Sequence, residues 1–116
     1  MRLHHLALRT ADLPRLEAFY TGVLGLNVSR RQGERSVWIE AGETILMLER
    51  KEASEPPLAI DSLEMFAFAI TPERKDEFLT RLAAAKVALE GSTNHTLYFR
   101  DPDGRRVGLS AFPEKL

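Results

Sequence analysis

The segment HLALRTAD, residues His5–Asp12, decides the fold because it joins an expected strand to an expected helix. Its apolar side chains alternate with polar or small ones, a period of two that is typical of a strand with one buried face. Asp12 then offers a side-chain cap, and Pro14 is tolerated in the first turn of a helix. The sequence therefore predicts a strand over residues 3–10 and a helix between Asp12 and Gly25.

Three short strands are expected after this helix. They cover residues 27–32, 36–41 and 44–50. Gly33 and Gly42 supply the turns between them. A polar segment, residues 51–62, carries Pro56 and Pro57, which suit neither a helix interior nor a central strand. We interpret it as a surface linker.

The same order of elements then repeats. A strand is expected over residues 63–70, followed by a helix that starts at Thr71 and Pro72. Further strands are expected over residues 87–90, 95–101 and 105–112, and the turn at Asp101-Pro102-Asp103-Gly104 separates the last two. The chain thus predicts one compact α+β domain of two βαβββ modules, residues 1–50 and 63–116, joined by the linker 51–62.

Composition excludes several classes of protein. The 116 residues carry 16 Lys and Arg against 17 Asp and Glu. The chain is therefore not expected to have a positive electrostatic field that would attract nucleic acid. Cysteine is absent, which excludes disulfides and thiolate metal sites. The longest apolar run, residues 65–70, is too short to cross a membrane, and no signal-peptide core is seen at the N-terminus. We expect a cytoplasmic protein.

Three motifs resemble a known group. HLALRTADL at 5–13, FYTGVLGL at 19–26 and YFRDPDGRRVGL at 98–109 are similar to segments of the vicinal oxygen chelate superfamily. That group includes glyoxalase I, the fosfomycin- and bleomycin-resistance proteins and the extradiol dioxygenases. The resemblance implies the glyoxalase/bleomycin resistance/dihydroxybiphenyl dioxygenase-like fold, with a cleft inside curved mixed sheets. It also implies a small-molecule ligand and a homodimer.

The metal site that this resemblance implies is degenerate here. Relatives that use a metal place ligands at the positions of His5, Met65 and Gly108, and only His5 can coordinate a hard divalent ion. Glu49 is the best substitute, provided that Ile45 and Met47 face the cleft; the opposite strand register turns Glu49 outward. His5 and Glu49 would together be one ligand short of a typical catalytic site for Mn, Fe, Ni or Zn.

Alternation also identifies the side chains that face the cleft. His5, Ala7 and Arg9 point away from the helix in the first strand, and Met65, Ala67 and Ala69 do so in the fifth. The resemblance adds Thr96 and Tyr98, and it turns His95 away. The predicted ligand-binding residues are His5, Ala7, Arg9, Met65, Ala67, Thr96, Tyr98 and Gly108.

Three hypotheses about function follow. The first is a small-molecule-binding protein with a degenerate metal site. The second is a metal-dependent lyase, isomerase, dioxygenase or thiol transferase of the same superfamily that uses His5 and Glu49. The third is a non-catalytic partner or regulatory subunit that keeps the fold for its interface. The sequence leaves open whether any reaction is catalysed.

Overall fold

The computed structural model describes residues 1–116, and the chain divides into two compact units, Met1–Pro57 and Leu58–Leu116. The boundary falls inside the segment 51–62 that was expected to be a linker. Each unit holds one four-stranded mixed sheet and helical segments, so the α+β class and the paired βαβββ order are confirmed.

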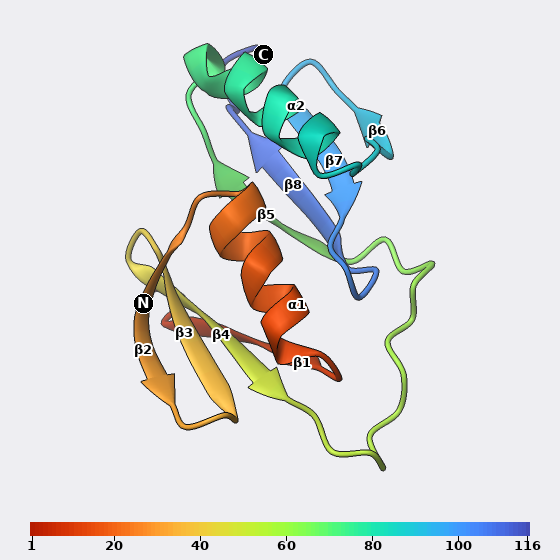
Figure 1. The fold of residues 1–116 in the computed structure, drawn as a ribbon. Helices are drawn as coiled ribbons and strands as arrows, with labels where there is room; N and C mark the ends of the chain where they lie inside the picture. The colour runs from red at the N-terminus through yellow and green to blue at the C-terminus, as the bar shows by residue number, and fades with distance from the viewer. The chain divides into compact units, whose positions relative to one another are not determined.

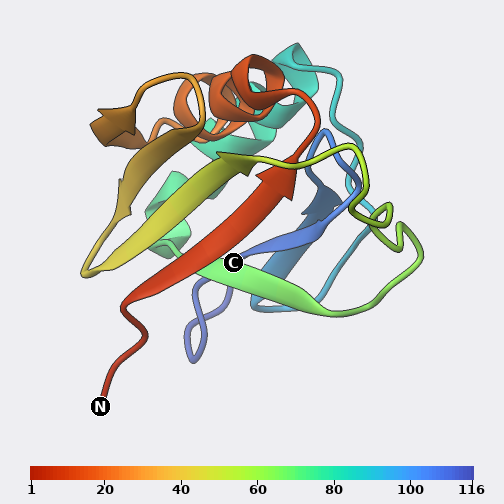
Figure 2. The ribbon, with the colours of Figure 1, turned by 90° about the horizontal axis from the view of Figure 1, so that it is seen from below.

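Unit 1 has the strand order β1-β4-β3-β2. Strands β1 and β4 are parallel neighbours, and the remaining pairs are antiparallel. Figures 1 and 2 show β1 beside β4, with the helical segment on one side of this sheet. The elements are β1 (His5–Thr10), α1 (Leu13–Ala18), η1 (Phe19–Val23), β2 (Asn27–Gln32), β3 (Ser36–Ala41) and β4 (Thr44–Arg50).

The core of unit 1 lies between α1–η1 and the sheet. The Asp12 side chain caps α1 by accepting a hydrogen bond from the backbone N–H of Arg15, as predicted. The helix continues into a π-helical turn, η1, before Gly25 with a positive φ ends it. The buried apolar side chains are Leu8, Leu13, Leu16, Phe19, Tyr20, Leu24, Val37, Ile39, Leu46 and Leu48.

Unit 2 repeats this arrangement with the strand order β5-β8-β7-β6. Its parallel pair is β5 with β8, and Figure 1 shows α2 beside β7 and β8. The elements are β5 (Met65–Ala69), η2 (Pro72–Arg74), α2 (Lys75–Ala84), β6 (Gly91–Ser92), β7 (Thr96–Arg100) and β8 (Arg106–Ser110). The buried side chains are Phe78, Leu82, Leu97, Phe99, Val107, Leu109 and Ala111.

The expected strand over residues 87–90 is wrong. Val87 still donates its backbone N–H to Leu82 at the end of the helix, and Lys86 has φ of 58°. The chain therefore leaves α2 through a turn, and only Gly91 and Ser92 pair with β7. The other strands form where expected, with ends that differ by a few residues.

The registers of the two sheets correspond. In unit 1, β1 pairs Ala7 with Met47, and β3 pairs Trp38 with Met47. In unit 2, β5 pairs Ala67 with Gly108, and β7 pairs Tyr98 with Gly108. Ala7 and Trp38 thus correspond to Ala67 and Tyr98, both at an offset of 60 residues. This common register supports an internal duplication of the βαβββ module.

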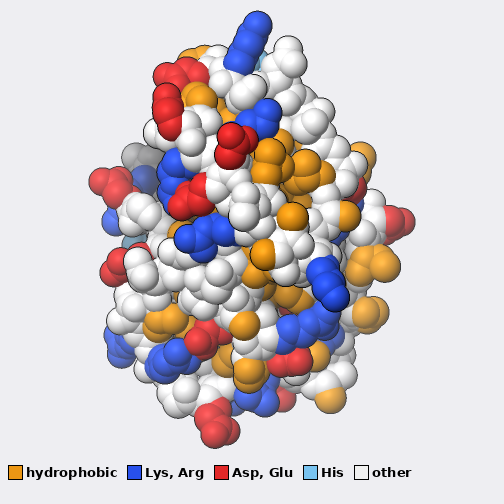
Figure 3. All heavy atoms as spheres, turned by 45° about the horizontal axis from the view of Figure 1, so that its top comes forward, with side chains coloured by type: hydrophobic (Ala, Val, Ile, Leu, Met, Phe, Trp, Pro, Cys, Tyr) orange, Lys and Arg blue, Asp and Glu red, His pale blue; other side chains and the backbone are white.

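The surface carries charges of both signs. Figure 3 shows acidic and basic side chains interspersed with apolar ones over the face in view. No helix in the chain combines the length and the apolar character needed to cross a bilayer.

Candidate functional site

The open face of sheet 1, meaning the side away from α1, carries the first group of predicted residues. Paired residues in neighbouring strands point to the same side of a sheet. His5, Ala7 and Arg9 are paired with Ile45, Met47 and Glu49, so all six lie on this face. The register left open by the sequence is thereby decided: Glu49 lies on the same side as His5.

His5 contacts its sequence neighbour. The Nδ1 atoms of His4 and His5 lie 3.0 Å apart, and the two rings meet edge to face with centroids 5.2 Å apart. One ring must donate and the other accept in this hydrogen bond, so the contact requires at least one neutral imidazole. Both side chains lie at the exposed start of β1.

Arg9 is held by two carboxylates within unit 1. Its Nε and Nη2 donate to the two oxygens of Glu55 at 3.0 and 2.8 Å, and its Nη1 lies 3.4 Å from Glu49. The hydrogen bond with Arg9 lowers the pKa of Glu55 to about 2, and the backbone N–H of Glu52 adds to the effect. The positive charge of Arg9 is therefore already compensated by the protein.

The predicted metal pair does not converge. His5 pairs with Ile45 and Arg9 pairs with Glu49, so His5 and Glu49 are four residues apart along parallel strands, about 13 Å. The chain holds no group of three or more His, Asp or Glu side chains that could bind an ion. The residues present therefore do not fit the metal that the resemblance implies.

The open face of sheet 2, the side away from α2, carries the remaining predicted residues. Met65 and Ala67 pair with Arg106 and Gly108, and β7 contributes Thr96 and Tyr98 to the same side. A Cβ atom at Gly108 would lie 2.7 Å from Cε of Met65 and 3.2 Å from both Ala67 and Thr96. The methionine thus fills the space that a side chain at position 108 would need.

Polar groups lie on either side of this apolar contact. Thr96 Oγ1 donates to Ser110 Oγ at 2.9 Å. Along β8 in the other direction, the guanidinium of Arg106 lies over the Tyr98 ring, with its central carbon 4.4 Å from the centroid. Sheet 2 therefore presents a hydroxyl pair, an apolar floor and a cation in that order.

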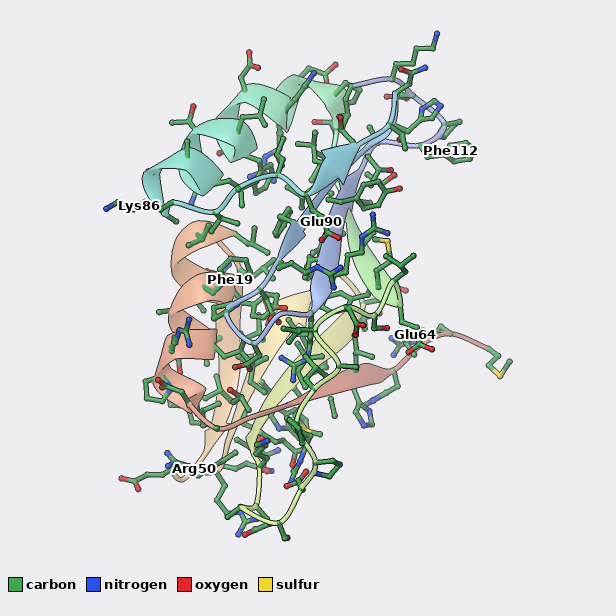
Figure 4. The ribbon with its side chains drawn as sticks, turned by 90° about the vertical axis from the view of Figure 1, so that its right-hand side faces the viewer. Phe19, Arg50, Glu64, Lys86, Glu90 and Phe112 are labelled. Atoms are coloured by element: carbon green, nitrogen blue, oxygen red, sulfur yellow. The ribbon has the colours of Figure 1, made fainter.

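Glu90 balances part of the charge at the Arg106 end. Both of its carboxylate oxygens accept hydrogen bonds from Arg100, which lowers the pKa of Glu90. Arg100 also donates to the carbonyl oxygens of Ser62 and Gly104. Glu90, labelled in Figure 4, lies just before β6, where its backbone N–H donates to Tyr98. Arg106 lies farther from this carboxylate, at 3.8 Å.

His95 contacts the C-terminal segment and not the open face. Its Nδ1 lies 2.7 Å from the carbonyl oxygen of Glu114, and its ring meets Phe112 edge to face. Figure 4 labels Phe112 in the C-terminal segment that follows β8. The expectation that His95 turns away from the ligand-facing side agrees with this position.

The sequence prediction did not include Trp38, Arg106 or Ser110 among the residues of the open faces. The pairings of Trp38 with Met47, of Arg106 with Met65 and of Ser110 with Thr96 place them there. Alternation along β8 from Gly108 could have identified Arg106 and Ser110, since both lie two residues from it. No comparable signal distinguished Trp38 from a core residue.

A separate depression of about 740 Å³ lies on the helix side of unit 1. Its lining includes the ion pair between Arg31 and Glu17, with atoms 2.6 Å apart, and none of the predicted ligand-binding residues.

Comparisons with known proteins find one family model and many similar folds. The model of the Glyoxalase/Bleomycin resistance protein/Dioxygenase superfamily matches residues 2–109. Glutathione transferase FosA of Serratia marcescens is 30% identical over 112 residues, which cover 92% of this chain and 78% of that protein.

Two solved structures are also similar. Lactoylglutathione lyase from Agrobacterium tumefaciens superimposes with a TM-score of 0.74 at 25% identity, covering 94% of this chain and 92% of that one. The E126Q mutant of the fosfomycin resistance protein FosX from Listeria monocytogenes, complexed with Mn(II) and 1S,2S-dihydroxypropylphosphonic acid, gives 0.78 at 20% identity. Here 95% of this chain and 89% of that chain are covered.

Proposed function

Because the chain belongs to the Glyoxalase/Bleomycin resistance protein/Dioxygenase superfamily, we propose that it binds a small organic molecule without a metal ion. The ligand lies on the open face of sheet 2, with Met65, Ala67 and Gly108 beneath it and Thr96 and Tyr98 beside it. His5, Ala7 and Arg9 are proposed separately, as ligand-contacting residues on the open face of sheet 1. No reaction is assigned to this site.

The observation that carries the proposal is that the end of the Met65 side chain fills the space directly above Gly108. Two of the three positions at which the resemblance implies metal ligands hold a thioether and a hydrogen atom, and they pack against each other. A thioether is a soft ligand, poorly suited to Mn or Mg, whereas it contacts aromatic rings favourably. The substitutions therefore favour an apolar ligand surface over a coordination site.

Relatives differ on this point. The FosX structure named above holds Mn(II), and FosA is called a glutathione transferase. A metal-dependent enzyme that uses His5 and Glu49 is thus the alternative to test, with Mn, Fe, Ni or Zn as the ion. The separation of these two residues along β1 and β4 counts against it.

Binding of neutral aromatic probes tests the proposal. Protein dialysed against a chelator is titrated with indole and with benzamide, and the backbone amide resonances are followed by NMR. We expect saturable shifts at residues 65–67, 96–98 and 108, and a rise in the unfolding temperature, because the probe binds only the folded state. Adding Mn or Zn should leave both unchanged.

Ala67→Leu should weaken this binding at least fivefold, since the larger side chain occupies the floor of the site. Ala84→Leu adds the same volume on the exposed side of α2 and serves as the matched control. The proposal fails if the purified protein holds one equivalent of Mn, Fe, Ni or Zn that is lost in His5→Ala, or if neither probe shifts sheet 2.

A further inference from the structure

Arg106 is the one ionised side chain on the open face of sheet 2 without a hydrogen-bond partner. Its Nε is buried and donates to no atom of the protein, and its side chain is only 21% exposed. Buried donors are nearly always paired, and a charged donor without an acceptor is unfavourable. Because Nε itself is closed off from solvent, a bound molecule would meet the guanidinium through the part of the side chain that stays exposed, where no protein acceptor is hydrogen-bonded.

The nearest carboxylate does not fill this role. Glu90 lies 3.8 Å from Nε of Arg106, beyond hydrogen-bond distance, and both of its oxygens are already used by Arg100. Arg100 in turn donates from all three of its nitrogens. Glu90 is therefore hydrogen-bonded to Arg100 alone, and Arg106 has only the longer ion-pair contact with it.

Tyr98 holds this charge in a fixed orientation. The central guanidinium carbon of Arg106 lies 4.4 Å from the ring centroid, so the group makes a cation–π contact with Tyr98. The N–H donors at its edge stay unused, and their fork matches two oxygens of a carboxylate or a phosphonate. A prepositioned fork loses little conformational freedom when an oxyanion binds.

The opposite case is seen in unit 1. Arg9, on the open face of sheet 1, is neutralised by a bidentate contact with Glu55 and by Glu49. The sequence alone offered Arg9 among the ligand-binding residues, but the guanidinium without a hydrogen-bonded acceptor, that of Arg106, lies on sheet 2. Arg106 is thus the better candidate for contact with an anion.

We infer that the ligand of sheet 2 is an organic oxyanion whose carboxylate or phosphonate binds the guanidinium of Arg106, while its apolar body lies over Met65 and Ala67. This inference rests on the proposed function and adds the charge of the ligand to it. The hydroxyl pair of Thr96 and Ser110, four residues along β8 from Arg106, can contact a polar group at the far end of a longer ligand.

Three probes of similar size test the inference. Benzoate, phenylphosphonate and neutral benzamide are titrated into the full chain at constant ionic strength and pH 7.5, and dissociation constants are taken from NMR shifts. We expect at least one of the two anions to bind tenfold or more tightly than benzamide, with the largest shifts at residues 98 and 106–108. The ranking of the two anions distinguishes a carboxylate site from a phosphonate site.

Variants assign the effect to Arg106. In Arg106→Gln the preference for anions over benzamide should fall to less than twofold, while benzamide binding stays within threefold of the wild type. Arg106→Lys keeps the charge without the fork and should retain an intermediate preference. Arg15→Gln removes the same charge from the exposed surface of α1 and should leave all three constants unchanged.

The outcomes separate the two proposals. Equal binding of anions and benzamide, or an anion preference that persists in Arg106→Gln, would overturn the inference and leave the apolar ligand site intact. If none of the three probes shifts sheet 2, the inference and the proposed function both fail. A folded spectrum of Arg106→Gln in the same experiment shows that lost preference is not lost structure.

Discussion

At the scale of single residues, Gly108 and Met65 are packed against each other on sheet 2. Gly108 is buried on the open face of sheet 2, and the end of the Met65 side chain occupies the space above it. A flexible thioether fills an irregular gap well. The pair therefore converts two positions implied to hold ligands into a packed apolar contact.

We expect Gly108→Ala to destabilise the chain by about 1–3 kcal/mol, because the new Cβ would be overpacked against Ala67, Thr96 and Met65. Met65→Ala should relieve part of this cost in the double variant, with a coupling of about 1 kcal/mol. Urea unfolding of the wild type, the two single variants and the double variant measures this coupling energy. Strictly additive effects would show that Met65 does not occupy the space above Gly108.

Glu55 and Arg9 give a pH dependence of known sign. The pKa of Glu55 is lowered to about 2, so its carboxylate stabilises the folded state above its ordinary value of 4.5, and this contribution is lost as the pH falls towards 2. The Glu55 carboxyl resonance should titrate near pH 2 by NMR and move towards 4.5 in Arg9→Gln. A midpoint near 4.5 in the wild type would contradict the ion pair.

At the scale of elements, the turn between β7 and β8 fixes the register that brings Tyr98 and Arg106 together. Asp101 Oδ1 accepts hydrogen bonds from the backbone N–H groups of Asp103 and Arg105 at 2.9 and 3.0 Å. Gly104 donates its N–H to the Asp101 carbonyl and has φ of 92°, a conformation that favours glycine. The structural role predicted for this turn is confirmed.

Asp101→Ala should cost about 1–3 kcal/mol of unfolding free energy, because two backbone donors at a buried site lose their acceptor. Asp103→Ala is the control, since that carboxylate accepts a single hydrogen bond, at 3.2 Å from Arg105 Nη1. We expect the control to cost under half as much in urea unfolding. Equal losses of unfolding free energy in Asp101→Ala and Asp103→Ala would contradict the role of the Asp101 side chain in stabilising this turn.

At the scale of the whole molecule, the duplicated module leaves apolar side chains on the surface. Ile60, Leu63 and Phe112 of unit 2 are each about 70% exposed, and Leu3 of unit 1 is 61% exposed. Contiguous apolar patches commonly mark contact surfaces, whereas single exposed apolar side chains are ordinary. The homodimer expected from the resemblance therefore stays a prediction.

Sedimentation velocity decides this point. We expect a species of twice 13.1 kDa, about 26 kDa, at micromolar concentration, and an unfolding temperature that rises with protein concentration. Leu63→Glu should shift the mass towards 13.1 kDa, whereas Ala84→Glu on exposed α2 should not. A wild-type mass of 13.1 kDa throughout the concentration range would contradict the prediction.

The sequence by itself determined the repeated strand–helix–strands order and the faces of β1 and β5, whereas the loss of two implied metal ligands at Met65 and Gly108 stays a prediction. These follow from local rules, since alternation, caps and turn residues act over a few neighbours. It misplaced β6, because the exit from α2 at Lys86 depends on a backbone conformation that neighbouring residues do not specify.

Tertiary structure alone decided which charges are compensated. Arg9 meets Glu55 across 46 residues of sequence, and Arg100 binds both oxygens of Glu90 while Arg106 keeps none. Strand register and loop path bring such partners together, and no local pattern encodes them. Arg106 was therefore recognised as the side chain best placed to receive an anion only after the strands within each sheet had been paired.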